Sequence, residues 1–60
     1  MKKTQAKQLH NHDQIQIRTT QGTWETGTIL GEPHEQSGRI LIPTITPTDG
    51  YRWIDHTDAK

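Results

Sequence analysis

The sequence predicts a small all-β domain, a strongly bent barrel of four to five antiparallel strands. The chain has 60 residues, of which only 27% are hydrophobic, so it cannot build a thick two-layer core. Isoleucine, tryptophan and tyrosine supply much of the bulky apolar surface, and these side chains favour strands over helices. Cysteine is absent, which excludes a disulfide framework and a thiolate metal site.

The N-terminal third predicts an arm followed by a first strand. Residues 1–8 are mostly polar, so we expect a flexible basic arm, at most one helical turn long, and a barrel over residues 9–60. From Asp13 onward, Ile15 and Ile17 alternate with polar residues, which is the period of a half-buried strand.

A turn at residues 21–22 leads to a second predicted strand over residues 23–30, whose composition favours β structure. Gly27 interrupts this strand, and a glycine inside a strand usually marks a bulge or a close backbone approach. A bulge there would switch the register so that both Trp24 and Ile29 point inward. We therefore place Trp24 in the core, where large aromatic side chains dominate burial.

The C-terminal half adds a loop, two strands and a closing segment. Residues 31–38 have the composition of a loop throughout. Residues 39–45 are the densest apolar run, and Pro43 within it predicts an edge position or a bend, because proline lacks an amide donor. Residues 47–50, Pro-Thr-Asp-Gly, are the strongest turn signal. A strand over residues 51–54 and a polar tail that forms a turn and a closing strand complete the prediction.

Short strands at this spacing are typical of an SH3-like or Tudor-like barrel. The ordered signals also resemble the C-terminal domain of retroviral and retrotransposon integrases over roughly residues 7–60. The resemblance rests on Asp13-x-Ile15-x-Ile17 with His12 at a glycine position of the family, on Trp24-x-x-Gly27-x-Ile29, and on the run Trp53 to Lys60. It implies an SH3-like fold and DNA binding without the zinc-binding and catalytic parts of an integrase, as in a fragment or a detached module. The closing segment, commonly basic in that family, here contains Asp55 and Asp58.

The charges are unevenly placed although the net charge is zero. Residues 1–20 carry four basic and one acidic side chain, whereas residues 21–60 carry three basic and six acidic ones. A basic segment is the electrostatic footprint of phosphate binding. Our leading hypothesis is a non-catalytic nucleic-acid-binding module that contacts backbone phosphates of DNA or RNA weakly, with strong salt dependence and low sequence specificity. The candidate contacts are Lys2, Lys3, Lys7, Arg18, Arg39, Tyr51 and Arg52.

Three of these candidates have a predicted orientation. Arg18 and Arg52 alternate with apolar residues along their strands, so their charged ends are expected to project from the solvent face. Tyr51 follows the turn glycine Gly50, which is expected to hold its ring near the barrel rim.

The alternative hypothesis is a protein-interaction module that binds a partner peptide at the barrel rim or at an edge strand near residues 43–47. The acidic C-terminal half would complement a basic partner. Because so small a core supplies little stability, self-association is a further expectation.

The sequence points away from several other classes. It has no nucleophile motif or glycine-rich phosphate loop, so we expect neither enzymatic activity nor a cofactor. His10, His12, His34 and His56, with Asp13, are the set that suggests a metal site. His10 and His12 precede the first strand, and we expect no metal there. No apolar run approaches the roughly 18 residues of a membrane span, and no export signal follows Met1, so a cytoplasmic or nuclear location is expected.

Overall fold

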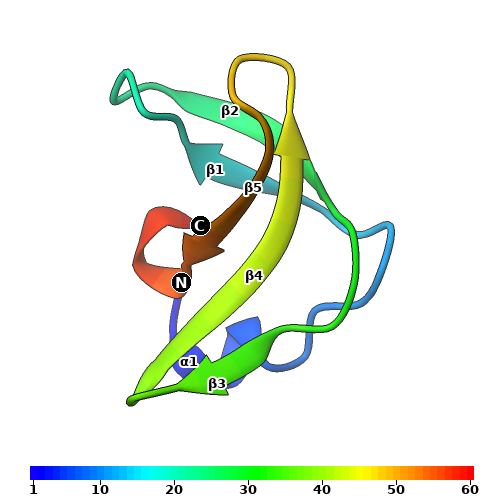
Figure 1. Ribbon diagram of the computed structural model, residues 1–60, viewed down its shortest axis with the longest axis vertical. Coiled ribbons are helices and arrows are strands. Elements are labelled where there is room, and N and C mark those ends of the chain that lie inside the picture. Colours follow the sequence, from blue (N-terminus) through cyan, green and yellow to red (C-terminus); the bar gives the residue numbers. More distant parts are fainter.

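The computed structural model describes all 60 residues and confirms a small all-β barrel (Figure 1). No helix in it is long and apolar enough to span a membrane. In chain order the elements are α1 (Lys3–Ala6), β1 (Gln14–Arg18), β2 (Trp24–Ile29), β3 (His34–Gln36), β4 (Arg39–Thr46), β5 (Gly50–Asp55) and the single 3₁₀ turn η1 (His56–Asp58).

β4 is the central strand of one antiparallel sheet. One of its edges pairs first with β3 and then, further along, with β2. β2 and β3 therefore act as two halves of one strand that bends over residues 30–33. The other edge of β4 pairs with β5 from Leu41 to Thr46, and β1 lies on the far side of β2.

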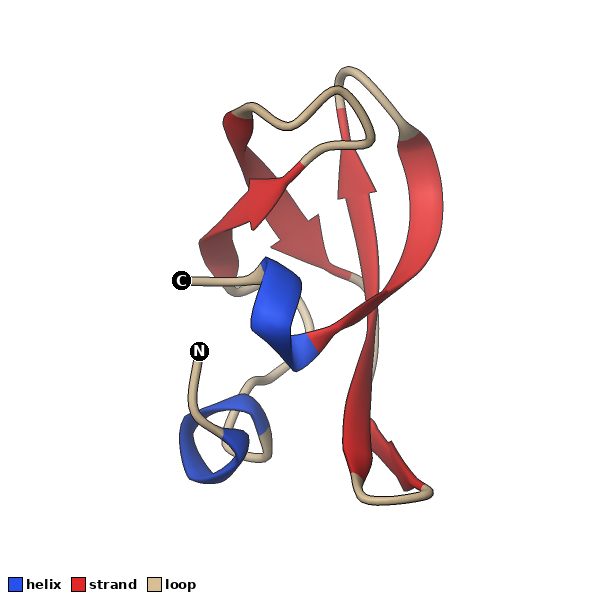
Figure 2. Ribbon diagram, turned by 90° about the vertical axis from the view of Figure 1, so that its left-hand side faces the viewer, coloured by secondary structure: helices blue, strands red, loops and turns tan.

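The end of the chain returns to β1 and closes the barrel. After η1, Ala59 forms an isolated antiparallel bridge with Ile17, and the amide of Lys60 donates to the carbonyl of Gln16 at 2.9 Å. Figure 2 shows the two chain ends lying near each other, while the β3–β4 hairpin projects away from the rest of the barrel. This arrangement matches the predicted turn and closing strand of the polar tail.

The core consists almost entirely of isoleucine. Each buried isoleucine lies at a strand position next to an outward-facing residue, as the period of two requires. The buried hydrophobic residues are Ala6, Ile17, Ile29, Ile40, Ile42, Ile54 and Ala59. All three aromatic side chains lie outside this cluster.

The predicted bulge at Gly27 and the core position of Trp24 are both wrong. β1 and β2 pair in continuous register from Gln14 opposite Thr28 to Arg18 opposite Trp24, so alternation turns Trp24 outward, where it is 40% exposed. Glycine is present at position 27 for a different reason, because the side chain of Ile17 occupies the space that a Cβ atom would need. It is a site of close approach.

The bulge of this sheet lies at His12 instead. The amide of His12 donates to the carbonyl of Ile29, and the amide of Ile29 donates to the carbonyl of Asp13, each at 2.8 Å. Two residues thus oppose one, which is the definition of a bulge. His12 has a φ of 78°, in the left-handed region that normally favours glycine.

Of the two alternatives predicted for Pro43, an edge position or a bend, the edge position is wrong, because β4 has partners along both edges. Pro43 is tolerated since it lies opposite the bend between β2 and β3, where no ladder needs its missing amide. Its carbonyl accepts from the amide of Leu30 at 2.9 Å.

Residues 31–38 are not a loop throughout, since they contain β3. Ser37 and Gly38 have φ values of 52° and 75° and join the paired residues Gln36 and Arg39, which defines a two-residue hairpin turn. The expectation failed because β3 is stabilised by pairing with β4 rather than by its own polar composition.

The N-terminal segment is packed against the barrel, which differs from the flexible arm that its composition predicts. The segment forms the one helical turn α1, and Ala6 is fully buried because its methyl group fits within the core cluster. The ammonium group of Met1 donates to the carbonyls of His56 and Ala59. These contacts join residues 1–8 to the closing segment of the barrel.

Substituting Gly27 tests the close approach. A Cβ atom at Gly27 would overlap the Ile17 side chain and lie 2.8 Å from Thr46 Cγ2, so we expect Gly27→Ala to lower the free energy of unfolding by about 1 to 3 kcal/mol. The control is Gly31→Ala, whose Cβ would make an ordinary contact at 3.5 Å with Pro43. Urea unfolding measures both. Equal stability of the two variants would contradict the account of Gly27.

The backbone of His12 gives a second stability prediction. A non-glycine residue in the left-handed region lowers the free energy of unfolding by about 1 to 2 kcal/mol. Glycine removes this strain, but it also increases the conformational entropy of the unfolded chain, which offsets part of the gain in stability. We expect His12→Gly to raise the free energy of unfolding by up to about 1 kcal/mol. His12→Val should lower it, because a β-branched residue tolerates positive φ poorly. If urea unfolding shows that His12→Val is more stable than His12→Gly, the backbone of His12 is not strained.

Candidate functional site

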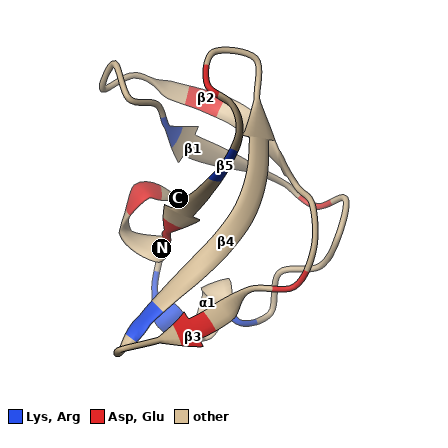
Figure 3. Cartoon of the chain, viewed as in Figure 1, with Lys and Arg blue, Asp and Glu red and all other residues tan.

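Most of the predicted phosphate-binding side chains are neutralised by carboxylates. Figure 3 shows basic and acidic segments spread over the same parts of the ribbon. Four ion pairs account for this: Lys7 with Glu35 at 3.1 Å, Arg18 with Asp58 at 2.8 Å, Arg39 with Asp55 at 3.4 Å and Arg52 with Asp49 at 3.3 Å. A cation that already faces a carboxylate contributes little positive potential for a phosphate.

Arg52 does not project from the solvent face as predicted. It lies opposite Thr44 and shares the inward side of β5 with Ile54. Its guanidinium donates to Asp49 and to the main-chain carbonyl of Arg18, each at 3.3 Å. The register of β4 and β5 therefore makes Arg52 a link between β5 and the end of β1.

The other predicted cations have different surroundings. Lys2 precedes α1 and Lys3 is its first residue, and neither lysine forms an ion pair. Arg18 and Lys60, which was not predicted, lie over Trp24 at 5.7 and 4.5 Å from the ring centroid. Arg18, Trp24 and Lys60 together form a cation–aromatic cluster on the outer side of β1 and β2.

Alternate residues of β4 and β5 form an apolar surface that points away from the core. Pro43, which is itself buried, lies opposite Trp53, and Ile45 lies opposite Tyr51. Tyr51 is 59% exposed, Trp53 45% and Ile45 43%. We call these residues, together with Leu41, the outer face.

β3 extends the outer face on the side of Trp53. The rings of His34 and Trp53 meet edge to face with centroids 5.3 Å apart, so the indole leans across β4 toward β3. Beside them is an open cleft of about 320 Å³ lined by His34, Gln36, Leu41 and Trp53. A cleft of this composition suits an apolar side chain from a partner.

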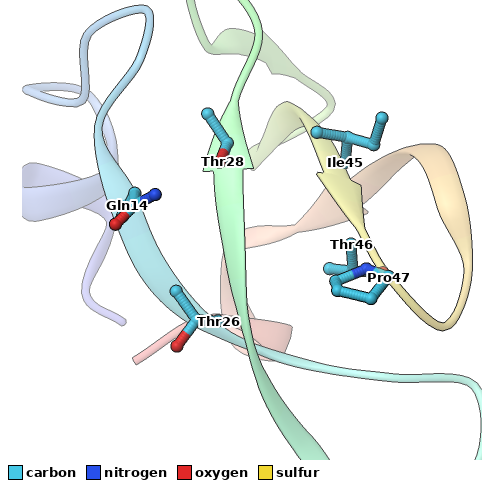
Figure 4. Close-up of a pocket in the computed structure, with 6 residues that line it drawn as sticks. All are labelled: Gln14, Thr26, Thr28, Ile45, Thr46 and Pro47. Atoms are coloured by element: carbon cyan, nitrogen blue, oxygen red, sulfur yellow. The ribbon is translucent and has the colours of Figure 1, made fainter.

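A second, more polar groove lies where the pairing between β2 and β4 ends. Figure 4 shows its lining side chains on β1, β2 and the end of β4, and its volume is about 400 Å³. The lining residues are Gln14, Thr26, Thr28, Ile45, Thr46 and Pro47. None of them is charged, so this groove offers no cation to a phosphate, while Ile45 connects it to the outer face.

Sequence reasoning selected Tyr51 as a surface residue but missed the rest of the outer face. One signal was available: in residues 40–43 both the even and the odd positions are apolar, which is unnecessary for a strand with one buried face. Alternation with the buried Ile40 and Ile42 assigns Leu41 and Ile45 to the opposite side.

Carboxylates fasten the turn between β4 and β5. Asp49 accepts hydrogen bonds from the hydroxyl and amide of Thr20, and Glu25 accepts two from Thr48. The hydrogen bonds from Thr20, with a smaller contribution from Arg52, hold the pKa of Asp49 below its ordinary value. These bonds join the two turns at this end of the barrel.

Asp55 plays a similar part at the other end of β5. The Thr57 hydroxyl donates to it at 2.6 Å, and Arg39 lies beside it. The Thr57 hydrogen bond, followed by the contacts with Arg39 and His56, lowers the pKa of Asp55 to about 2, although partial burial opposes the shift.

The remaining histidines are not gathered into a cluster. No group of three or more His, Cys, Asp or Glu side chains is arranged to hold a metal ion. His56 lies near the core, with its Nδ1 atom 3.3 Å from the amide nitrogen of Ile40, while His10 is exposed.

Comparisons with protein-family models, with curated proteins and with solved structures find no match to this chain.

The two carboxylates predict a loss of stability in acid. Because their pKa values in the folded state lie below the ordinary value of 3.8, their contribution is present above that value and is lost as the pH falls toward 2. We expect the urea midpoint to fall over this interval. The Asp49→Asn/Asp55→Asn double variant should start lower at neutral pH and change less.

Glu32→Gln is the matched control, since Glu32 forms no ion pair or side-chain hydrogen bond. It should keep the wild-type profile. An equally steep fall in the double variant would contradict the assignment to Asp49 and Asp55.

Proposed function

We propose that this protein is a protein-interaction module that binds a partner polypeptide on its outer face. The observation that carries the proposal is the exposure of Tyr51, Trp53 and Ile45 on adjacent, rigidly paired strands. Large exposed aromatic side chains on a small domain otherwise rich in polar residues are typical of interaction surfaces. Tyrosine and tryptophan are also the residues that most often carry binding energy in such interfaces.

The electrostatics support this choice over phosphate binding. Neutralising phosphates requires cations free to replace counterions, and most of the predicted cations already face carboxylates. The cleft beside Trp53 has no lysine, arginine or carboxylate in its lining, and its Leu41 and Trp53 side chains suit an apolar side chain better than a phosphate.

Nucleic-acid binding is the second candidate, and one observation favours it. Trp24 is half exposed and lies beneath Lys60, a cation without a carboxylate partner, with Arg18 nearby. Such a cluster could stack an unpaired base and contact its phosphate. The resemblance to integrase C-terminal domains agrees with this candidate, and the left-handed backbone of His12, at the position where that family has glycine, supports the resemblance.

Selection from a displayed library of random peptides tests the protein-interaction proposal. We expect the wild-type module to enrich peptides with apolar side chains, and the Tyr51→Ser and Trp53→Ser variants to bind the selected peptides about tenfold more weakly or worse. Gln8→Ser, an exposed change just after α1, is the control and should bind normally. Failure to enrich any peptide, or equal binding by all variants, would overturn the proposal.

A parallel NMR titration with a short duplex and a short single strand tests the second candidate. Amide shifts at Arg18, Trp24 and Lys60 that vanish between low and physiological salt would support it. Peptide binding at the outer face should change little with salt, because that face is apolar and its bordering charges are paired.

A further inference from the structure

The main chain of β4 determines which way each residue of β5 presents its hydrogen-bonding groups. The Pro43 carbonyl points toward β2, where it accepts from Leu30. In an antiparallel strand these directions alternate, so the even-numbered residues of β4 point toward β5. The amide of Ile40 agrees, because it donates to His56, just beyond the end of β5.

The register then fixes the same property for β5. Arg52 and Ile54 lie opposite Thr44 and Ile42, so their main-chain groups face β4. Alternation directs the amide and carbonyl groups of Tyr51, Trp53 and Asp55 away from β4. We call these groups the open edge of β5.

No strand covers the open edge. β5 pairs with β4 alone, and no main-chain or side-chain hydrogen bond outside the strand ladders involves the amide or carbonyl of Tyr51 or Trp53. The indole of Trp53 leans toward His34 on β3, which is the side away from this edge. An unpaired edge of this kind is a template for another extended strand.

The charges that border β5 specify the chemistry of the partner. Asp49, at its start, pairs with Arg52, and Asp55, at its end, pairs with Arg39. Asp58, in the following turn, pairs with Arg18. Each of these three carboxylates is thus matched by one guanidinium, so these pairs offer a charged partner segment no unpaired opposite charge.

We infer that β5 binds an uncharged, extended polypeptide segment as an added strand, through main-chain hydrogen bonds to its open edge. Alternate apolar side chains of that segment pack beside Tyr51 and Trp53, since side chains on one face of adjacent strands lie opposite each other. The inference rests on the proposed protein-interaction function and names the partner as a neutral apolar strand.

Hydrogen exchange measured by NMR tests the edge, first in the free protein. The amides of Arg52 and Ile54, which bond to β4, should exchange slowly, and those of Tyr51, Trp53 and Asp55 should exchange fast. Adding a peptide obtained from the library selection should slow the three fast amides. Uniform protection along β5 in the free protein would overturn the inference.

Amide-to-ester replacement isolates the main-chain contribution, and a chain of 60 residues is within reach of total synthesis. An ester at Trp53 removes its N–H donor but keeps the indole, and should weaken peptide binding about threefold to tenfold. It also makes the Arg52 carbonyl, which accepts from Thr44, a weaker acceptor, so we expect a loss of stability smaller than that of the control. The control, an ester at Ile54, should reduce stability because that amide bonds to β4.

The outcomes separate this inference from the proposed function. One outcome is that selected peptides bind without slowing the amide exchange of Tyr51 and Trp53, and that the ester at Trp53 leaves their binding unchanged. In that case side chains alone bind the peptide, and the added strand is refuted. If a second copy of this chain covers the open edge instead, seen as a concentration-dependent mass without peptide, the neutral peptide partner is refuted. If no peptide is selected, the proposed function itself fails.

Discussion

The fold depends on the pairing of β4 along both of its edges. A central strand cannot ordinarily contain proline, because each amide on one side must donate to a neighbour. The bend between β2 and β3 removes that demand at Pro43, and the Pro43 carbonyl still accepts from Leu30. Once β4 is held in this way, alternation assigns Ile40 and Ile42 to the core and orients the main chain of β5.

The distribution of side chains between core and surface is unusual for so small a chain. Five isoleucines and two alanines form the whole buried hydrophobic cluster, while both tryptophans and the tyrosine remain outside it. Burying an aromatic ring would contribute more to stability than burying an alanine. The rings of the outer face therefore stay outside the core, and the proposed partner binding would bury them.

Charged side chains in this protein mainly form hydrogen bonds and ion pairs that connect segments of the barrel. Asp49 joins the β4–β5 turn to Thr20 of the β1–β2 turn, and Asp55 accepts from Thr57 in η1. Arg52, directed inward from an edge strand, is a feature by which native sheets limit uncontrolled edge pairing. β5 thus combines an open edge with a feature that limits uncontrolled pairing, which agrees with the proposed binding of a partner strand.

The sequence by itself determined the class of fold, the first hairpin, the Pro-Thr-Asp-Gly turn and the alternation of Tyr51 with Arg52, because periodicity and turn chemistry are local properties. The tertiary structure alone decided that Trp24 faces outward, that residues 34–36 form a strand and that Ala6 enters the core. It also decided which cations are neutralised, since Arg18 and Asp58 are 40 residues apart. Such outcomes depend on strand register and on contacts between distant residues, and a local pattern contains neither.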